Sequence, residues 1–505
     1  MIKLLLYAIG SVTFNIPIVM TVLFMVFYIA IGVMSFKRPA LALILYYGTA
    51  IMNPQFHYPL FTMLPMAKIS AGICLLACMV NARSLSFSLP KSLLLPLTFV
   101  LFSVLCTISA IDPSLAERRF GEFINIGIML FMVVWAVETR DDLDCLFWGV
   151  LGSFWFGVLK NLVETQTMGR WYAVRGTGGW LSDSNDWALA VAMSVPLFYA
   201  SCFHPRIKAT WLRVFMGCTL MAALLVVTIT SSRGAFLATG AAFGALMITE
   251  SKKLRAVAGM GVILLVVIAY MPESYMDQIN SIFDVGETAS EVWQGEQQSD
   301  KYTGAERVYF WRVALQIMRE NPITGIGWGN FVEQFALREG LEEGAVAHST
   351  WFQVAAEAGA VALAAYVGMI ITALISLLQS LKRAREQNDQ LLALLARAFG
   401  AGIVAFIVGG SFISRENSEL IFLYVIMAAM LPQVLTKQAA KMTSVQKPAA
   451  VGCELSEPAS IESEPTAGWA MQGEGGGPVA DRPPRYVTRA RKSARYVLKN
   501  NQKGK

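Results

Sequence analysis

Charged residues are scarce in this sequence. Only 15% of its 505 residues carry a charge, whereas 55% are hydrophobic. Ordinary soluble domains have about 25% charged residues, so the composition excludes a typical soluble protein. The formal net charge is +6, but much of the excess lies at the end of the chain and the rest lies in loops between apolar runs. The charge balance therefore does not indicate nucleic-acid binding.

The apolar runs also lack the alternation of apolar and polar residues that membrane strands show. Many of them are long enough to cross a hydrocarbon layer of about 30 Å as a helix. We therefore expect an all-α polytopic membrane protein with about 12–13 transmembrane helices. The expected segments are 16–36, 39–53, 64–81, 93–111, 120–138, 143–163, 187–203, 214–231, 234–249, 256–271, 360–381, 391–414 and 420–436.

Residues that bind metals or cofactors are few and scattered. Six cysteines lie in or beside apolar segments and Cys453 lies in a polar tail, with neither a metal-ligand spacing nor a disulfide framework. No Gly-x-Ser-x-Gly nucleophile elbow is present. The sequence thus predicts no metal site and no cofactor. It has only three histidines, His57, His204 and His348.

Lysine and arginine gather in alternate loops, which is typical of the cytoplasmic side of a membrane protein. That bias places the long polar loop, 272–359, on the outer face. We expect an N-terminal transmembrane bundle over 1–271 and C-terminal transmembrane helices over 360–437. Residues 438–505 are rich in Pro, Glu, Ser and Gly and end in a basic stretch, which predicts a disordered cytoplasmic tail.

Several arginines fall on the expected outer face. Guanidinium groups bind phosphate oxygens bidentately and stay charged at any relevant pH, whereas the alternative for each is contact with lipid headgroups. Arg233 stands beside Gly234 in a tight hairpin between two apolar segments, and both interpretations stay open there. Arg307 and Arg312 lie on a segment with helical periodicity. We favour headgroup contact for Arg118, Arg119, Arg170 and Arg415.

The segment Asn321–Phe331 contains a proline and three glycines. Such a segment ends a helix and forms a compact turn. A backbone site for phosphate is the alternative, and we favour the structural turn.

His348 lies near the end of the long loop and is followed by Ser349. Serine can cap a helix, so the sequence predicts a helix that starts after Ser349 and runs into the next membrane segment. The positive end of that helix would favour a neutral imidazole, which could act as a base near neutral pH. The alternative is a merely solvated histidine in a polar loop.

Together these residues resemble the bacterial O-antigen ligases. The family pattern is H-[NSQ]-x9-G-x-x-[GTY] at the end of a large periplasmic loop, and His348-Ser349 is followed by nine residues and then Gly359. Ala362 departs from the last element. The family's second pattern, Arg-x3-Leu, is met by Arg233, whereas Arg307 has a tryptophan in place of the leucine.

The resemblance covers roughly residues 90–436. It implies a GT-C-like glycosyltransferase in the bacterial inner membrane whose active site lies on the periplasmic face. It further implies inverting, metal-independent transfer of a glycan from undecaprenyl diphosphate to the lipid A-core oligosaccharide. His348 would be the general base, and Arg233 and Arg307 would hold the diphosphate. Arg175, Arg312, Ser349 and Gly359 would contact substrate.

Three alternatives remain. The superfamily includes O-antigen polymerases, and the opening third of the chain resembles ligases of exosortase systems, which are thought to glycosylate proteins. A lipid-linked glycan transporter is the third. It would require ionisable residues in mid-membrane, and the apolar segments hold few of them.

Overall fold

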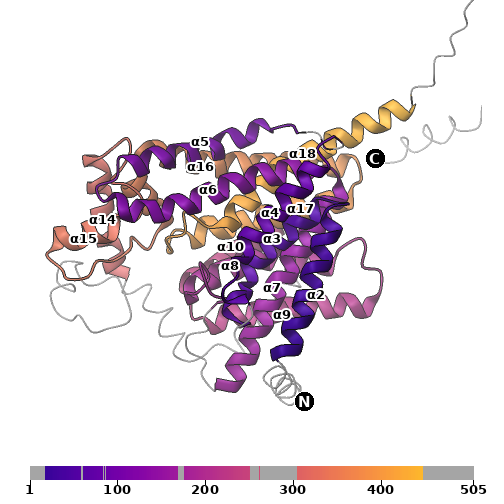
Figure 1. Ribbon diagram of the computed structural model, residues 1–505, viewed down its shortest axis with the longest axis horizontal. Coiled ribbons are helices and arrows are strands. Elements are labelled where there is room, and N and C mark those ends of the chain that lie inside the picture. The colour runs from indigo at the N-terminus through magenta and orange to yellow at the C-terminus, as the bar shows by residue number, and fades with distance from the viewer. Residues whose placement is uncertain are drawn as a thin grey trace, which may run out of the picture. The chain divides into compact units, whose positions relative to one another are not determined.

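The computed structural model describes residues 17–58, 61–83, 85, 87–168, 176–250, 261 and 304–446. Within these ranges every regular element is a helix, and the only strand-like pairing is a single bridge between Gly178 and Leu181. The all-α prediction is therefore confirmed. The described residues belong to one compact unit (Figure 1), and the expected tail lies outside them, apart from the end of the last helix.

Twelve of the thirteen expected apolar segments coincide with a helix, and segment 256–271 lies almost wholly outside the described residues. Before the long loop the helices are α2 (Pro17–Ser35), α3 (Ala40–Met52), α4 (Met66–Val80), α5 (Leu94–Ile108), α6 (Pro113–Ala136), α7 (Arg140–Met168), α8 (Ser184–Cys202), α9 (Thr210–Ile229) and α10 (Arg233–Thr249). The loop carries α14 (Gly304–Glu320) and α15 (Phe331–Glu339), and the chain continues with α16 (Thr350–Glu386), α17 (Gln390–Gly409) and α18 (Glu419–Gln446).

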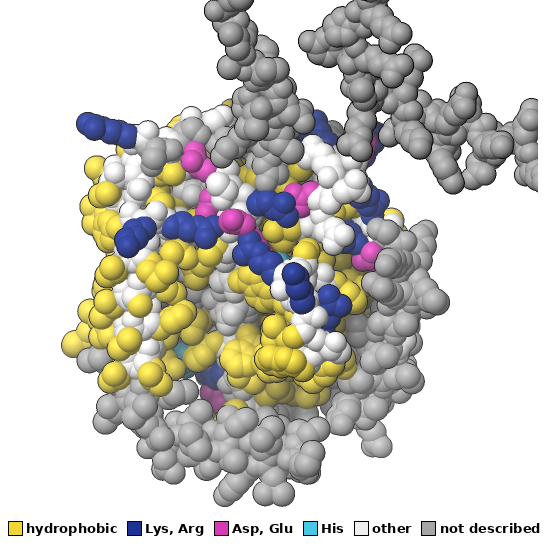
Figure 2. Space-filling view, turned by 90° about the vertical axis from the view of Figure 1, so that its right-hand side faces the viewer, with side chains coloured by type: hydrophobic (Ala, Val, Ile, Leu, Met, Phe, Trp, Pro, Cys, Tyr) yellow, Lys and Arg dark blue, Asp and Glu magenta, His cyan; other side chains and the backbone are white. Residues whose placement is uncertain are grey.

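Seven helices of the described residues are long and apolar enough to cross a membrane, and three shorter apolar helices accompany them. The protein is therefore a multi-pass membrane protein. Two further helices, α3 and α8, are buried on nearly all sides, which is typical of a helix inside a bundle. The short segment 39–53 thus forms a core helix, which packs against α4 and α7. Figure 2 shows one face of the molecule, where hydrophobic side chains cover broad areas and Lys and Arg gather in a band.

A second group of helices frames the region around the long loop. α8 packs against α9, α10 and α17, while α16 packs against α5, α17 and α18. The loop helices α14 and α15 lie against α16 (Figure 1). Residues Asn321–Phe331 form the expected turn between α14 and α15, and the backbone N–H of Ile111 donates to the Ile326 carbonyl at 3.0 Å, which ties the turn to the α5–α6 connection.

His204 has a structural environment. Its Nε2 lies 2.7 Å from Asp144 Oδ1, and both side chains are fully buried. The backbone N–H of Arg206 donates to His204 Nδ1 at 3.3 Å, so Nε2 carries the proton that is shared with the carboxylate. This arrangement fastens the turn after α8 to α7.

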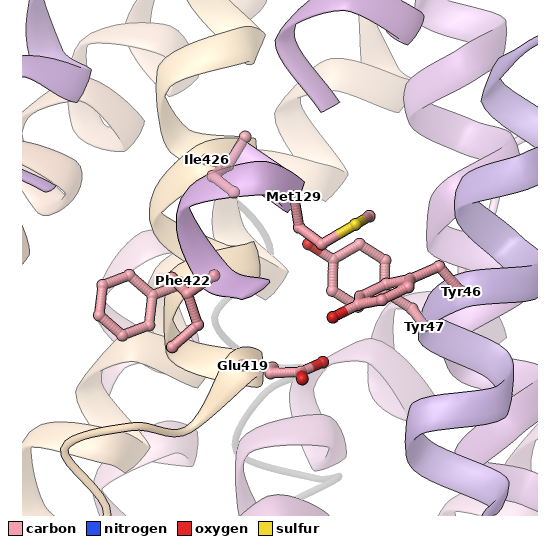
Figure 3. A pocket seen from close by; sticks show the side chains of 7 residues that line it. Tyr46, Tyr47, Met129, Glu419, Phe422 and Ile426 are labelled. Carbon is pink, nitrogen blue, oxygen red and sulfur yellow. The ribbon is translucent and has the colours of Figure 1, made fainter. Parts of the chain in front are cut away.

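A small cavity lies between α3, α6 and α18 (Figure 3). Tyr46, Tyr47, Met129 and Glu419 line it together with three aliphatic and aromatic side chains, and its free space is about 10 Å³. Such a space holds a single water molecule and is too small for a sugar or a lipid.

Candidate active site

His348 occupies an unusual backbone position. Its φ angle is +48°, in the left-handed region, which costs a non-glycine residue about 1–2 kcal/mol. On its N-terminal side, the Ala347 carbonyl accepts a hydrogen bond from Trp311 Nε1 at 3.1 Å, and the Ala347 N–H donates to Gln353 Oε1 at 3.0 Å. Helix α14 and the first turn of α16 therefore fix the backbone that leads into His348.

The loop between α17 and α18, residues 410–418, fixes the backbone on the other side. The Ser349 N–H donates to Ser414 Oγ at 3.1 Å. The Thr350 N–H donates to the Gly410 carbonyl at 2.8 Å, and the Thr350 hydroxyl donates to the Ile413 carbonyl at 2.7 Å. His348 is thus held between two segments that are remote from it in sequence.

The helix that follows His348 starts where the sequence predicts. Ser349 is the N-cap residue of α16, but its side chain makes no capping hydrogen bond and is fully buried. The prediction of a side-chain cap was therefore wrong: the loop 410–418 covers this helix end and supplies acceptors for the Ser349 and Thr350 N–H groups. The proposal that Ser349 contacts substrate stays a prediction.

The imidazole of His348 is neutral at physiological pH. Burial lowers its pKa from 6.5 to about 4, Arg307 lowers the pKa further, and Asp183 acts in the opposite direction. The main cause of this lowered pKa is burial, with the positive charge of Arg307 second, whereas the sequence pointed to the end of the helix. Arg307 and Asp183 therefore lie close enough to act on the imidazole.

Helix α14 brings Arg307 to His348. The ring of Phe310, on the same helix, lies 6.0 Å from the imidazole ring, and the ring of Trp311 stacks on Phe352 of α16 at 5.1 Å. These contacts fix the helix face from which Arg307 interacts with the histidine. Arg312, a predicted substrate contact, is exposed on α14.

Arg233 is the first residue of α10 and directly follows the tight α9–α10 hairpin. A Cβ added at Gly234 would lie 3.1 Å from Phe412 Cβ, so this end of α10 approaches the loop 410–418 closely. The same loop binds Ser349 and Thr350 through Ser414 and Ile413. It therefore connects the helix that begins with Arg233 to the residues directly after His348. Arg175, a predicted substrate contact, and Arg170 lie outside the described residues.

Gly359 forms a kink inside α16. Its φ is +77°, and a Cβ there would lie 2.4 Å from the Ile323 carbonyl oxygen, so only glycine fits. The Ala360 N–H donates to the Pro322 carbonyl at 2.9 Å, and the Gly327 N–H donates to the Glu357 carbonyl at 2.9 Å. The Asn321–Phe331 turn is therefore structural, as expected, and packs into the kink. Gly359 positions this turn, and its contact with substrate stays a prediction.

Sequence reasoning missed the charges that surround this region. Arg415 forms an ion pair with Asp186 at the start of α8, and its side chain is 21% exposed. Burial lowers its pKa, and Glu416 and Asp183 act in the opposite direction. The expectation that Arg415 contacts lipid headgroups was wrong, because its guanidinium pairs with the Asp186 carboxylate, 229 residues away in the sequence. The signal for a buried site was the density of charge in 415–419, between two apolar segments.

The arrangement has the groups needed for acid–base chemistry on an anionic substrate. It offers one neutral imidazole, a guanidinium beside it and further charged groups on α8 and the loop 410–418. In the described residues, no three His, Cys, Asp or Glu side chains are grouped so that they could hold a metal ion.

A comparison with protein-family models matches the part of the chain that contains this region. Residues 218–367 match the family model described as O-Antigen ligase, which spans Arg233, Arg307 and His348. Residues 19–181 match a family of unknown function, DUF5935. No curated protein matches the chain.

Proposed function

Because the chain belongs to the O-antigen ligase family, we propose that it transfers a glycan from undecaprenyl diphosphate to the lipid A-core oligosaccharide in lipopolysaccharide biosynthesis. The reaction would take place at the periplasmic face of the bacterial inner membrane. It would invert the anomeric centre and need neither a metal nor a cofactor. The glycan and both lipids would enter from the membrane, between the loop and the bundle.

In this mechanism His348 accepts the proton of an acceptor sugar hydroxyl. The hydroxyl oxygen forms a bond to the anomeric carbon of the donor, and the bond from that carbon to the diphosphate oxygen breaks. Undecaprenyl diphosphate leaves with the bonding electron pair. Arg233 and Arg307 would bind its phosphate oxygens and stabilise the charge that develops, with Arg175 as a third contact.

One observation supports the proposal: burial and the guanidinium of Arg307 both lower the pKa of His348, inside the segment that matches the family model. A base must be unprotonated to act, and burial provides this state across the physiological range. In this proposal the positive charge of Arg307 has two effects: it disfavours the imidazolium form of His348, and it attracts the diphosphate.

The test is a transfer assay with purified protein, lipid-linked glycan as donor and lipid A-core as acceptor. His348→Ala is expected to lower the rate by about 10²–10⁴-fold, with normal protein levels. His57→Ala is a matched control, because His57 is also a half-buried histidine whose pKa burial lowers to about 4, yet the charge that acts on it is that of Lys160 and not that of Arg307. Wild-type rates in His348→Ala would overturn the proposal.

The same assay separates the alternatives by their acceptors. A polymerase would extend lipid-linked glycan when no lipid A-core is present, and a protein ligase would attach glycan to a polypeptide. A transporter would move the donor across the membrane of a vesicle without forming any covalent product. Transfer to lipid A-core alone supports the ligase.

A further inference from the structure

Gln353 is a buried polar residue that the proposed mechanism does not use. Gln353 is only 5% exposed and lies one turn into α16. Its Oε1 accepts from the Ala347 N–H at 3.0 Å and from Ser414 Oγ at 3.3 Å. One amide oxygen thus joins Ala347, the residue directly before His348, to the loop 410–418.

Glu357 determines which way that amide points. Gln353 Nε2 donates to Glu357 Oε1 at 2.7 Å, and the same oxygen accepts from the Phe331 N–H at 3.1 Å. The backbone N–H groups of Ala347 and Phe331 can only donate, so Gln353 Oε1 and Glu357 Oε1 are their acceptors and the NH₂ of Gln353 faces Glu357. The amide oxygen is then directed toward Ala347.

The two side chains connect His348 to the kink of α16. Glu357 is 1% exposed and stands two residues before Gly359, where the Asn321–Phe331 turn packs. The hydrogen bonds run from Phe331 through Glu357 and Gln353 to Ala347. A residue at φ +48° persists only when its surroundings hold it there.

We propose that Gln353 and Glu357 are positioning residues that hold the imidazole of His348 in the orientation in which it removes the acceptor's proton. This inference rests on the proposed role of His348 as the base. Neither side chain touches substrate. Each acts through the backbone on the N-terminal side of the histidine.

The variants are chosen to separate geometry from charge and from folding. Gln353→Met and Glu357→Met keep the side-chain length and remove the hydrogen bonds. Glu357→Gln removes the charge but keeps an oxygen that can accept from Gln353 and Phe331. Gln433→Leu is the matched control, because Gln433 lies on membrane helix α18 and donates to the Ser88 carbonyl.

In steady-state transfer assays, Gln353→Met and Glu357→Met are expected to lower kcat by about 100-fold, as small misplacements of a reacting group do. The KM for the lipid-linked donor should stay within a factor of about two. Glu357→Gln should retain most of the wild-type kcat, and Gln433→Leu should retain it fully.

A double variant tests whether the effect passes through His348. When Gln353→Met is added to His348→Ala, the residual rate is expected to stay unchanged, because no imidazole remains to be positioned. A further loss in the double variant, a rise in KM with kcat unchanged, or full activity of Gln353→Met would each overturn the inference.

The two proposals fail differently. Wild-type activity in His348→Ala contradicts the proposed function itself. Loss of activity in His348→Ala together with normal kcat in Gln353→Met contradicts only the positioning role. If Gln353→Met does not accumulate in the membrane, the kcat of Glu357→Met against that of Glu357→Gln decides the matter, because these two differ in hydrogen bonding while both lack the charge.

Discussion

Replacing Arg307 with glutamine should change the pH dependence of transfer as well as its rate. The pKa of His348 is lowered from 6.5 to about 4, first by burial and then by Arg307, against the opposing effect of Asp183. At about 1.4 kcal/mol per pKa unit, this difference favours the neutral imidazole by about 3 kcal/mol. Since transfer requires the neutral form, the wild-type rate should fall only as pH drops through about 4.

The direction of the change follows from the sign of each contribution. Removing the positive charge of Arg307 makes protonation easier, so the pKa of His348 rises. A nearby charge typically shifts a pKa by about 1–3 units, and Arg307 ranks below burial. We therefore expect the acidic limb of the rate to move up by about one pH unit. Asp183→Asn should move it down, because the raising contribution is lost.

The assay measures kcat/KM for transfer between pH 3.5 and 8 in detergent, with protein integrity checked at each pH. Arg319→Gln is the control, because Arg319 is exposed on the same helix. The maximal rate of Arg307→Gln should also be lower, since a phosphate contact is lost, but this does not affect the midpoint of the limb. An unchanged midpoint in Arg307→Gln, or a wild-type midpoint near 6.5, would refute the reasoning.

Two further predictions concern stability, measured as thermal unfolding in detergent. Gly359→Ala should destabilise the protein by several kcal/mol, on the order expected for strain at a special backbone position, because Gly359 has φ +77° and no space for a Cβ. Gly240→Ala is the control and should be neutral or stabilising, because nothing lies within 4 Å of a Cβ there. Arg415→Ala should cost about 3 kcal/mol by leaving the Asp186 carboxylate unpaired. Arg338→Ala, which breaks an exposed pair, should cost less than about 1 kcal/mol. Equal losses in the two arginine variants would contradict the burial argument.

The helices could be predicted from the sequence because each apolar run is long and bounded by polar residues. The run 39–53 was expected as one of the membrane segments, and the structure shows it as a short helix that is buried on nearly all sides. The seven long apolar helices of the described residues agree with a polytopic protein. Their pairing could not be predicted, because the contacts depend on side-chain shape at positions that are all apolar.

The candidate site was only partly predictable. Periodicity placed Arg307 on a helix, and the motif spacing selected His348 and Gly359, but the kink at Gly359 came from its fit to the Asn321–Phe331 turn. The pair Arg415–Asp186 joins residues 229 positions apart, and no local pattern reveals such a partner. Ser349 shows the same limit. Its position before the helix could be predicted from nearby residues, whereas the hydrogen bond from its N–H to Ser414, 65 residues away, could not.

The connection between α17 and α18 has a consequence for biosynthesis. A ribosome makes the chain from its N-terminus, so His348, Arg233 and Arg307 are synthesised before Ser414 and Arg415. Until those last residues emerge, the backbone beside His348 has no acceptor for the Ser349 N–H and the start of α8 has no partner for Asp186. A nascent chain would thus hold its reactive histidine in an unformed site, and competence for transfer would begin only when the final hairpin of helices inserts.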